Sequence, residues 1–169
     1  LTVDCTASYC ERGINYNDNG TLALENVTVN AAGKNVTYAL NLPGSSDNAI
    51  VTIKDSRLTG NIALNAWGEN MTITATDSDF ISVDNNTAEG YAAVKLNNDG
   101  ETSAEGTTIE ICGGKIDVTG TAPEDTEAVS NGTSSGTVTI CQGTPVNGEI
   151  VTMVAVIRYA NDQSYSFTK

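Results

Sequence analysis

A recurring strand pattern constrains this chain more than any other feature. Six segments carry apolar residues two positions apart followed by a small or polar pair, and in the five longer segments another apolar residue follows. They begin at Leu1, Leu22, Val51, Ile73, Ile109 and Val138. Alternation of this kind predicts a strand with one buried face, then a bend, then a second strand. Because the segments recur at intervals too long for simple hairpins, the pattern indicates a repeat architecture.

The alternation also identifies the side chains that we expect in the core. On the first strand of four units these are Val51 and Ile53, Ile73 and Ala75, Ile109 and Ile111, and Val138 and Ile140. The pairs Asp55-Ser56, Asp77-Ser78 and Gly113-Gly114 are expected to form bends, after which Leu58, Phe80 and Ile116 point inward again. Two strands and two or three turns per unit predict one coil of a parallel β-solenoid, with about six coils over residues 1–150.

A β-sandwich is the rival all-β fold, since it also consists of many short strands separated by turns. The recurrence of small residues at the bends favours the solenoid, because a sandwich gives no reason for it. Residues 151–169 depart from the repeat: the apolar run Val151–Ala160, a turn and a short alternating segment predict a β-hairpin with Tyr165 and Phe167 on one face. We interpret this hairpin as a C-terminal cap of the same domain, with a connector to a further domain as the alternative.

A second series, of asparagines, recurs between these strands. Its members are Asn15, Asn41, Asn65, Asn97 and Asn131. We expect them to lie at a turn of each coil and to form a structural ladder, in which stacked amides hydrogen-bond from one coil to the next.

Four cysteines occur at Cys5, Cys10, Cys112 and Cys141, and none forms a CxxC pair. Cys112 and Cys141 each follow an inward isoleucine in neighbouring units, and in-register strands about 4.8 Å apart are within disulfide range. We therefore predict the disulfides Cys5–Cys10 and Cys112–Cys141, with four free thiols as the alternative. An even count at wide spacing favours an oxidising compartment, and hence a secreted or cell-surface protein.

The charge balance excludes several partners and activities. With 8 basic and 21 acidic residues the net charge is −13, so the chain lacks the clustered Lys and Arg that nucleic acids require. No stretch approaches the roughly 20 apolar residues of a membrane span, so we expect no membrane insertion. The absence of histidine excludes Ser/His/Asp catalysis and the HExxH zinc motif.

Acidic loops are the candidate metal site. Ca²⁺ takes six to eight oxygen ligands, and we select Asp77, Asp79 and Asp84 as candidates, although no EF-hand spacing is present. Calcium is the only cofactor that the sequence suggests. Arg57 and Lys115 occupy equivalent outward positions on either side of Asp79, an arrangement that suits either acid–base chemistry or a surface row of salt bridges.

Aromatic side chains are the candidate ligand-binding residues. Trp67 is the only tryptophan, and we expect it at a turn, where it either stacks on sugar rings or packs beneath a loop. Tyr38 and Tyr91, together with Tyr9 and Tyr16, are candidates to extend the same platform.

Three segments carry a resemblance to a known class of proteins. Residues 51–61, 109–120 and 136–148 resemble the coils of right-handed parallel β-helix proteins, and are most similar to pectate-lyase-like surface and carbohydrate-binding domains of bacteria. The resemblance covers roughly residues 1–150 and implies a right-handed helix that binds glycan or adheres to surfaces. No catalytic motif of the lyases matches a position in this chain.

The sequence thus predicts a non-catalytic, secreted or cell-surface β-helix module for glycan binding or adhesion, with an extracellular glycan or a host or cell-surface protein as partner. A calcium-dependent polysaccharide lyase or glycosidase is the enzymatic alternative. A structural stalk or spacer of a larger surface protein is the third.

Overall fold

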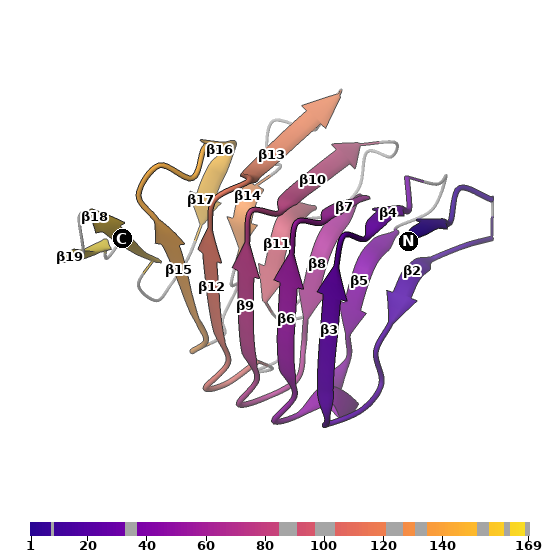
Figure 1. Cartoon of the computed structure of the whole chain (residues 1–169), viewed down its shortest axis with the longest axis horizontal. Helices are drawn as coiled ribbons and strands as arrows, with labels where there is room; N and C mark the ends of the chain where they lie inside the picture. Colours follow the sequence, from indigo (N-terminus) through magenta and orange to yellow (C-terminus); the bar gives the residue numbers. More distant parts are fainter. Residues whose placement is uncertain are drawn as a thin grey trace.

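The computed structural model describes residues 1–7, 9–32, 37–84, 91–96, 104–120, 127–130, 135–151, 156–160 and 163–167. These residues form three β-sheets, and the chain winds through all three in turn (Figure 1). Sheet A contains β1 (Thr2–Asp4), β4 (Thr28–Asn30), β7 (Arg57–Gly60), β10 (Asp79–Asp84), β13 (Lys115–Gly120) and β16 (Val146–Asn147). Sheet B contains β2 (Arg12–Asn15), β5 (Tyr38–Leu42), β8 (Ile62–Ala66), β11 (Ala92–Leu96), β14 (Glu127–Ser130) and β17 (Glu149–Val151). Sheet C contains β3 (Thr21–Glu25), β6 (Ile50–Lys54), β9 (Thr72–Thr76), β12 (Thr108–Cys112), β15 (Thr137–Cys141), β18 (Val156–Ala160) and β19 (Gln163–Phe167).

The chain visits the sheets in the fixed order C, A, B, and then begins the next coil. Every pairing between successive coils is parallel, as in β3 with β6 and β6 with β9. This order of parallel strands is consistent with a β-solenoid, and it excludes the antiparallel β-sandwich. The prediction of two strands per coil was wrong, because each coil has three. A short 3₁₀ helix, η1 (Gly44–Ser46), lies between β5 and β6.

Strands of sheet C show the alternation that the sequence predicts. Each of the eight expected core residues in β6, β9, β12 and β15 is at most 1% exposed. Leu58, Phe80 and Ile116, the residues expected to point inward after the bend, are fully buried in sheet A. Burying alternate residues leaves one face of sheet C in solvent, which is why polar and apolar residues alternate along it.

The bend between sheets C and A depends on left-handed backbone conformations. Asn26, Asp55, Asp77 and Gly113 all have positive φ angles at this corner, between 48° and 77°. Asparagine, aspartate and glycine are the residues that tolerate this conformation best. At Gly114 a side chain would clash with the Ser78 backbone of the previous coil, so this position requires glycine.

A row of buried hydroxyls follows the same corner. The Val27 N–H donates to Ser56 Oγ, and the Ser56 N–H donates to Ser78 Oγ, each at 3.1 Å. Both serines are at most 5% exposed. The small residues of the predicted bends therefore satisfy backbone donors that the bend would otherwise bury without partners.

The central strands of sheet B are buried on both faces. All five residues of β8 and all five of β11 are buried, and successive residues of a strand point to opposite faces. Asn15, Asn41 and Asn65 lie in strands β2, β5 and β8 of this sheet and not at a turn, which corrects the prediction for these three. Asn41 Nδ2 donates to Asn15 Oδ1, and Asn65 Nδ2 donates to Asn41 Oδ1, both at 2.7 Å. We call these three residues the amide row.

The strand register shows that the amide row does not continue with an asparagine after Asn65. Lys95, which is 8% exposed, occupies the position next to Asn65, and Ser130 follows it in the next coil. The assignment of Asn97 to this row was therefore wrong, since Asn97 comes two residues after the equivalent position. Asn97 and Asn131 themselves lie outside the described residues.

Both predicted disulfides are present. Cys5–Cys10 closes a short loop next to β1, and Cys112–Cys141 joins β12 to β15 on the solvent side of sheet C, with 4.8 Å between the Cα atoms. No free cysteine is found in the chain. The second bond thus joins strands of two successive coils.

The C-terminal segment forms the predicted hairpin. β18 extends sheet C by pairing in parallel with β15, and β19 returns antiparallel to β18. Tyr165 and Phe167 lie in β19, but their side chains are outside the description. Among the described residues, no helix is long and apolar enough to cross a bilayer.

Candidate binding face on sheet A

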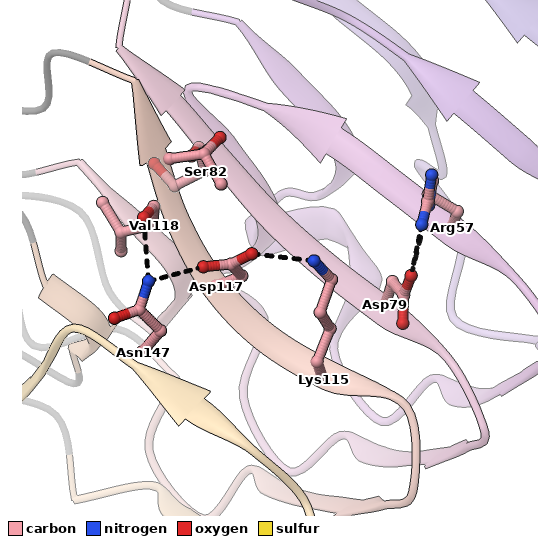
Figure 2. Close-up of polar contacts among 8 residues, drawn as sticks. Arg57, Asp79, Ser82, Lys115, Asp117, Val118 and Asn147 are labelled. Carbon is pink, nitrogen blue, oxygen red and sulfur yellow. Dashed lines mark hydrogen bonds and ion pairs between the residues drawn. The ribbon is translucent and has the colours of Figure 1, made fainter.

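The solvent side of sheet A carries a row of charged residues and, in the next row, a pair of polar residues. Register places Arg57, Asp79 and Lys115 side by side on β7, β10 and β13, as the sequence predicts. Two positions further along the strands, Asp117 lies beside Asn147 of β16. We call these five residues the sheet A cluster (Figure 2).

Two ion pairs organise the sheet A cluster. Arg57 donates from Nη2 to Asp79 Oδ2 at 2.8 Å and from Nε to the same oxygen at 3.2 Å. Lys115 Nζ lies 2.8 Å from Asp117 Oδ2 on its own strand. The prediction that Arg57 and Lys115 flank Asp79 is thus correct in register, although the ion pair described for Lys115 is with Asp117.

Asp117 is the most enclosed member of the sheet A cluster. Its other oxygen accepts a hydrogen bond of 2.8 Å from Asn147 Nδ2, which also donates to the Val118 carbonyl at 3.3 Å. Burial by itself raises the pKa of the Asp117 carboxyl, but hydrogen bonds from Lys115 and Asn147, with the charge of Lys115, outweigh it and hold the pKa below its ordinary value. Asp117 is therefore an ionised acceptor, which is the opposite of what a general acid requires.

Exposure differs between the positive and the negative members. The side chains of Arg57 and Lys115 are 55% and 38% exposed, whereas those of Asp79 and Asp117 are 24% and 13% exposed. The groups that a ligand meets first are thus cationic, although the chain as a whole carries −13. Pairing with the carboxylates beneath restricts the conformations of both cations.

Sequence reasoning identified three members of this cluster and missed Asp117 and Asn147. Asp117 is two residues after Lys115 and so shares its outward direction, which is a signal that could have been used. Nothing comparable identifies Asn147, because its approach to Asp117 depends on the pairing of β13 with β16.

The three acidic residues proposed for calcium are not brought together as a metal site. Asp77 forms the bend between sheets C and A, and Asp79 is bonded to Arg57, a partner that does not fit a divalent cation. Asp84 ends β10, and its side chain is outside the description. No group of three or more Cys, Asp or Glu side chains in the described ranges is arranged to hold a metal ion.

The predicted aromatic platform is not formed either. Tyr38 begins β5 and Trp67 follows the end of β8, so they lie at opposite ends of sheet B, roughly 16 Å apart along the strands. Tyr91 precedes β11 and is only 2% exposed, so its ring is not available to a ligand. The prediction that these three share one exposed surface was wrong.

Each aromatic residue has a local environment of its own. The Arg12 guanidinium lies 5.9 Å from the centroid of the half-buried Tyr38 ring, within the range of a cation–π contact. Trp67 is half-buried at the corner between sheets B and C, with its Nε1 atom enclosed.

Comparison with known proteins adds no relative. No protein-family model, curated protein or solved structure matches the chain. The function therefore has to be argued from the geometry of this molecule.

Proposed function

We propose that the chain is a secreted or cell-surface module of the right-handed parallel β-helix class that binds an extracellular glycan and does not catalyse a reaction on it. In this proposal residues 1–150 form the coils and the β18–β19 hairpin caps them. Two disulfides support an oxidising compartment, where such bonds persist.

The exposure of the sheet A cluster is the observation that carries the proposal. Two accessible cations lie above two shielded carboxylates on neighbouring strands, and the strand register holds all four in fixed places. Guanidinium, amide and carboxylate groups are the partners that sugar hydroxyls and sugar carboxylates bond in a directional way. Since the cations are the exposed groups, the cluster favours acidic glycans over neutral ones.

A binding comparison tests this assignment. The chain is exposed to an immobilised acidic polysaccharide, polygalacturonate, and to a neutral one, and retention is measured with and without calcium. We expect retention on the acidic polymer, weakening as salt is added because exposed charges are screened. The double variant Arg57→Ala/Lys115→Ala should lose it.

Lys54→Ala is the matched control, because Lys54 also forms an exposed ion pair, with Glu25, but on sheet C. It should bind as the unchanged protein does. Trp67→Ala tests the corner of sheets B and C separately. Retention that survives removal of Arg57 and Lys115, or no retention on either polymer, would contradict the proposal.

A stalk or spacer is the second candidate, and the axial bonding of the coils favours it. The amide row and the Cys112–Cys141 disulfide both connect successive coils along the direction in which a stalk is loaded. The lyase and glycosidase alternatives have less support, since Asp79 is paired with Arg57 and the pKa of Asp117 is lowered. Release of unsaturated uronides or new reducing ends from polysaccharide would establish them.

A further inference from the structure

The solvent side of sheet C carries ordered rows of threonine. One row runs across five strands as Thr21, Ile50, Thr72, Thr108 and Thr137, and the next runs as Ala23, Thr52, Thr74, Glu110 and Thr139. We call these the first and second threonine rows. Thr21, Thr52, Thr72 and Thr108 are exposed, Thr74 and Thr137 are half-buried, and Thr139 is 9% exposed.

Strand propensity alone does not explain this concentration. Threonine suits exposed positions of any strand, and sheet A offers such positions in the same coils. There the outward residues of β7, β10 and β13 include Arg57, Asp79, Lys115 and Asp117. Charged residues thus occupy the outward positions of sheet A named here, whereas on these strands of sheet C they are Glu110 in the second threonine row and the Glu25–Lys54 ion pair in the row beyond it.

The threonine rows are also unusual in charge for this molecule. Glu110 is the only charged residue among their ten positions, in a chain with a net charge of −13. A neutral face complements an uncharged surface and has little attraction for an ionic one. The two rows cover five strands about 4.8 Å apart and three residues of about 3.3 Å, which give roughly 240 Å². That area is well below the roughly 800 Å² per partner of a stable protein interface, which argues against a second copy as the occupant.

Spacing indicates which uncharged surface fits. Neighbouring hydroxyls repeat about every 4.8 Å across the strands and about every 6.6 Å along them. The interval across the strands is close to the shorter oxygen repeat of hexagonal ice, and each threonine adds a methyl group beside its hydroxyl. From this array we infer that the outer face of sheet C binds ice, by holding water in a lattice that joins the crystal.

Rigidity supports the same inference. The β-branched threonine side chain has few rotamers, and the parallel register fixes the backbone beneath it, so little conformational entropy is lost on binding. Ile50 keeps a β-branched methyl group in the first threonine row, whereas Glu110 interrupts the second with a charge. In Figure 1 the strands β3, β6, β9 and β12 lie side by side in one continuous sheet.

Inhibition of ice recrystallisation tests the inference with the whole chain and no glycan present, so the result is independent of the sheet A proposal. Thr74→Lys places a long charged side chain at the centre of the second threonine row and should abolish inhibition. Thr28→Lys is the matched control, since Thr28 is an exposed strand residue of sheet A, and it should leave inhibition unchanged. Circular dichroism verifies that each variant is folded.

Glu110→Thr makes the second threonine row continuous from Thr52 to Thr139 and should strengthen inhibition, measured as a lower protein concentration for the same effect. This variant decides the matter even if Thr74→Lys fails to fold. Absence of inhibition by the unchanged chain, equal loss in Thr74→Lys and Thr28→Lys, or no gain in Glu110→Thr would overturn the inference. Retention on crystalline cellulose or chitin without any effect on ice would assign the face to a polysaccharide instead.

Discussion

Sheets B and C belong to the same coils, yet their strands follow different patterns. Sheet C alternates buried and exposed residues, as in β6 and β9, whereas every residue of β8 and β11 in sheet B is buried. The difference teaches that position in the coil decides the pattern, because sheet C has one face in solvent and the central strands of sheet B have none. Function is accordingly expected on the solvent faces of sheets A and C, whereas the central strands of sheet B contribute to the core with both faces.

The largest expected effect comes from removing buried volume from sheet B. Leu64→Ala should lower the free energy of unfolding by about 2–5 kcal/mol, since Leu64 is fully buried and its loss leaves a cavity. Thr52→Ala, on the exposed face of sheet C, should change it by less than about 0.5 kcal/mol. Urea unfolding curves measure both. Equal losses would show that the two sheets do not differ as described.

The Cys112–Cys141 disulfide provides the next test, because it strengthens the solvent-facing sheet from outside the core. Replacing both residues with alanine should cost about 3–4 kcal/mol for a closed loop of 29 residues. The same change at Cys5 and Cys10, which are 5 residues apart, should cost about 2 kcal/mol on the same chain-entropy estimate. Thermal unfolding of both double variants measures the ranking, and a larger loss at Cys5–Cys10 would contradict it.

The amide row tests whether polar groups belong inside sheet B. Asn65→Leu leaves Asn41 Oδ1 without its donor, so we expect a loss of about 1–3 kcal/mol. Binding to polysaccharide should be unaffected. Asn15→Leu, at the exposed end of the same row, should cost less. If Asn65→Leu proved neutral or stabilising, the row would be a tolerated feature and not a stabilising one.

The same contrast between sheets B and C explains which parts of the fold could be predicted from the sequence. Alternation located the strands of sheet C and the inward residues of sheet A, because a single buried face leaves a period of two. Sheet B has no such period, so its strands were interpreted as turns around Asn41 and Asn65. The likeness of the Lys95–Asn97 segment to Ala63–Asn65 then misplaced Asn97, since the register aligns Lys95 with Asn65.

The candidate site was predictable only in part. Arg57, Asp79 and Lys115 share one position in the repeat, and position in the repeat determines lateral neighbours in a parallel stack. Their pairing does not follow from position, because Lys115 reaches along its own strand to Asp117. The prediction of a shared aromatic platform was wrong for a related reason. Spacing along the chain does not show at which end of a strand a residue lies.

The smallest expected effect on stability concerns sheet A, where acid protonates Asp117. Because the pKa of Asp117 is lowered in the folded state, its stabilising contribution is complete at neutral pH and is lost as pH falls below about 3.9 and through the folded value. Asn147→Leu removes one hydrogen bond to the carboxylate and should raise this pKa toward its ordinary value. Carbon-detected NMR titration of the Asp117 carboxyl measures the shift. A pKa that does not rise in the variant would show that Asn147 has no part in it.

The register between coils has a consequence for how the molecule can change in length. Ile50 pairs with Thr72, so one coil of sheet C, A and B occupies 22 residues here. Joining Ala49 directly to Thr72 would remove that coil, and β9 could then pair with β3 in the register that β6 has now. Inserting a copy of the same 22 residues would lengthen the stack by one coil. Duplication or loss of such a unit is therefore a small evolutionary step, and the same step offers engineers a protein whose length can be set in whole coils.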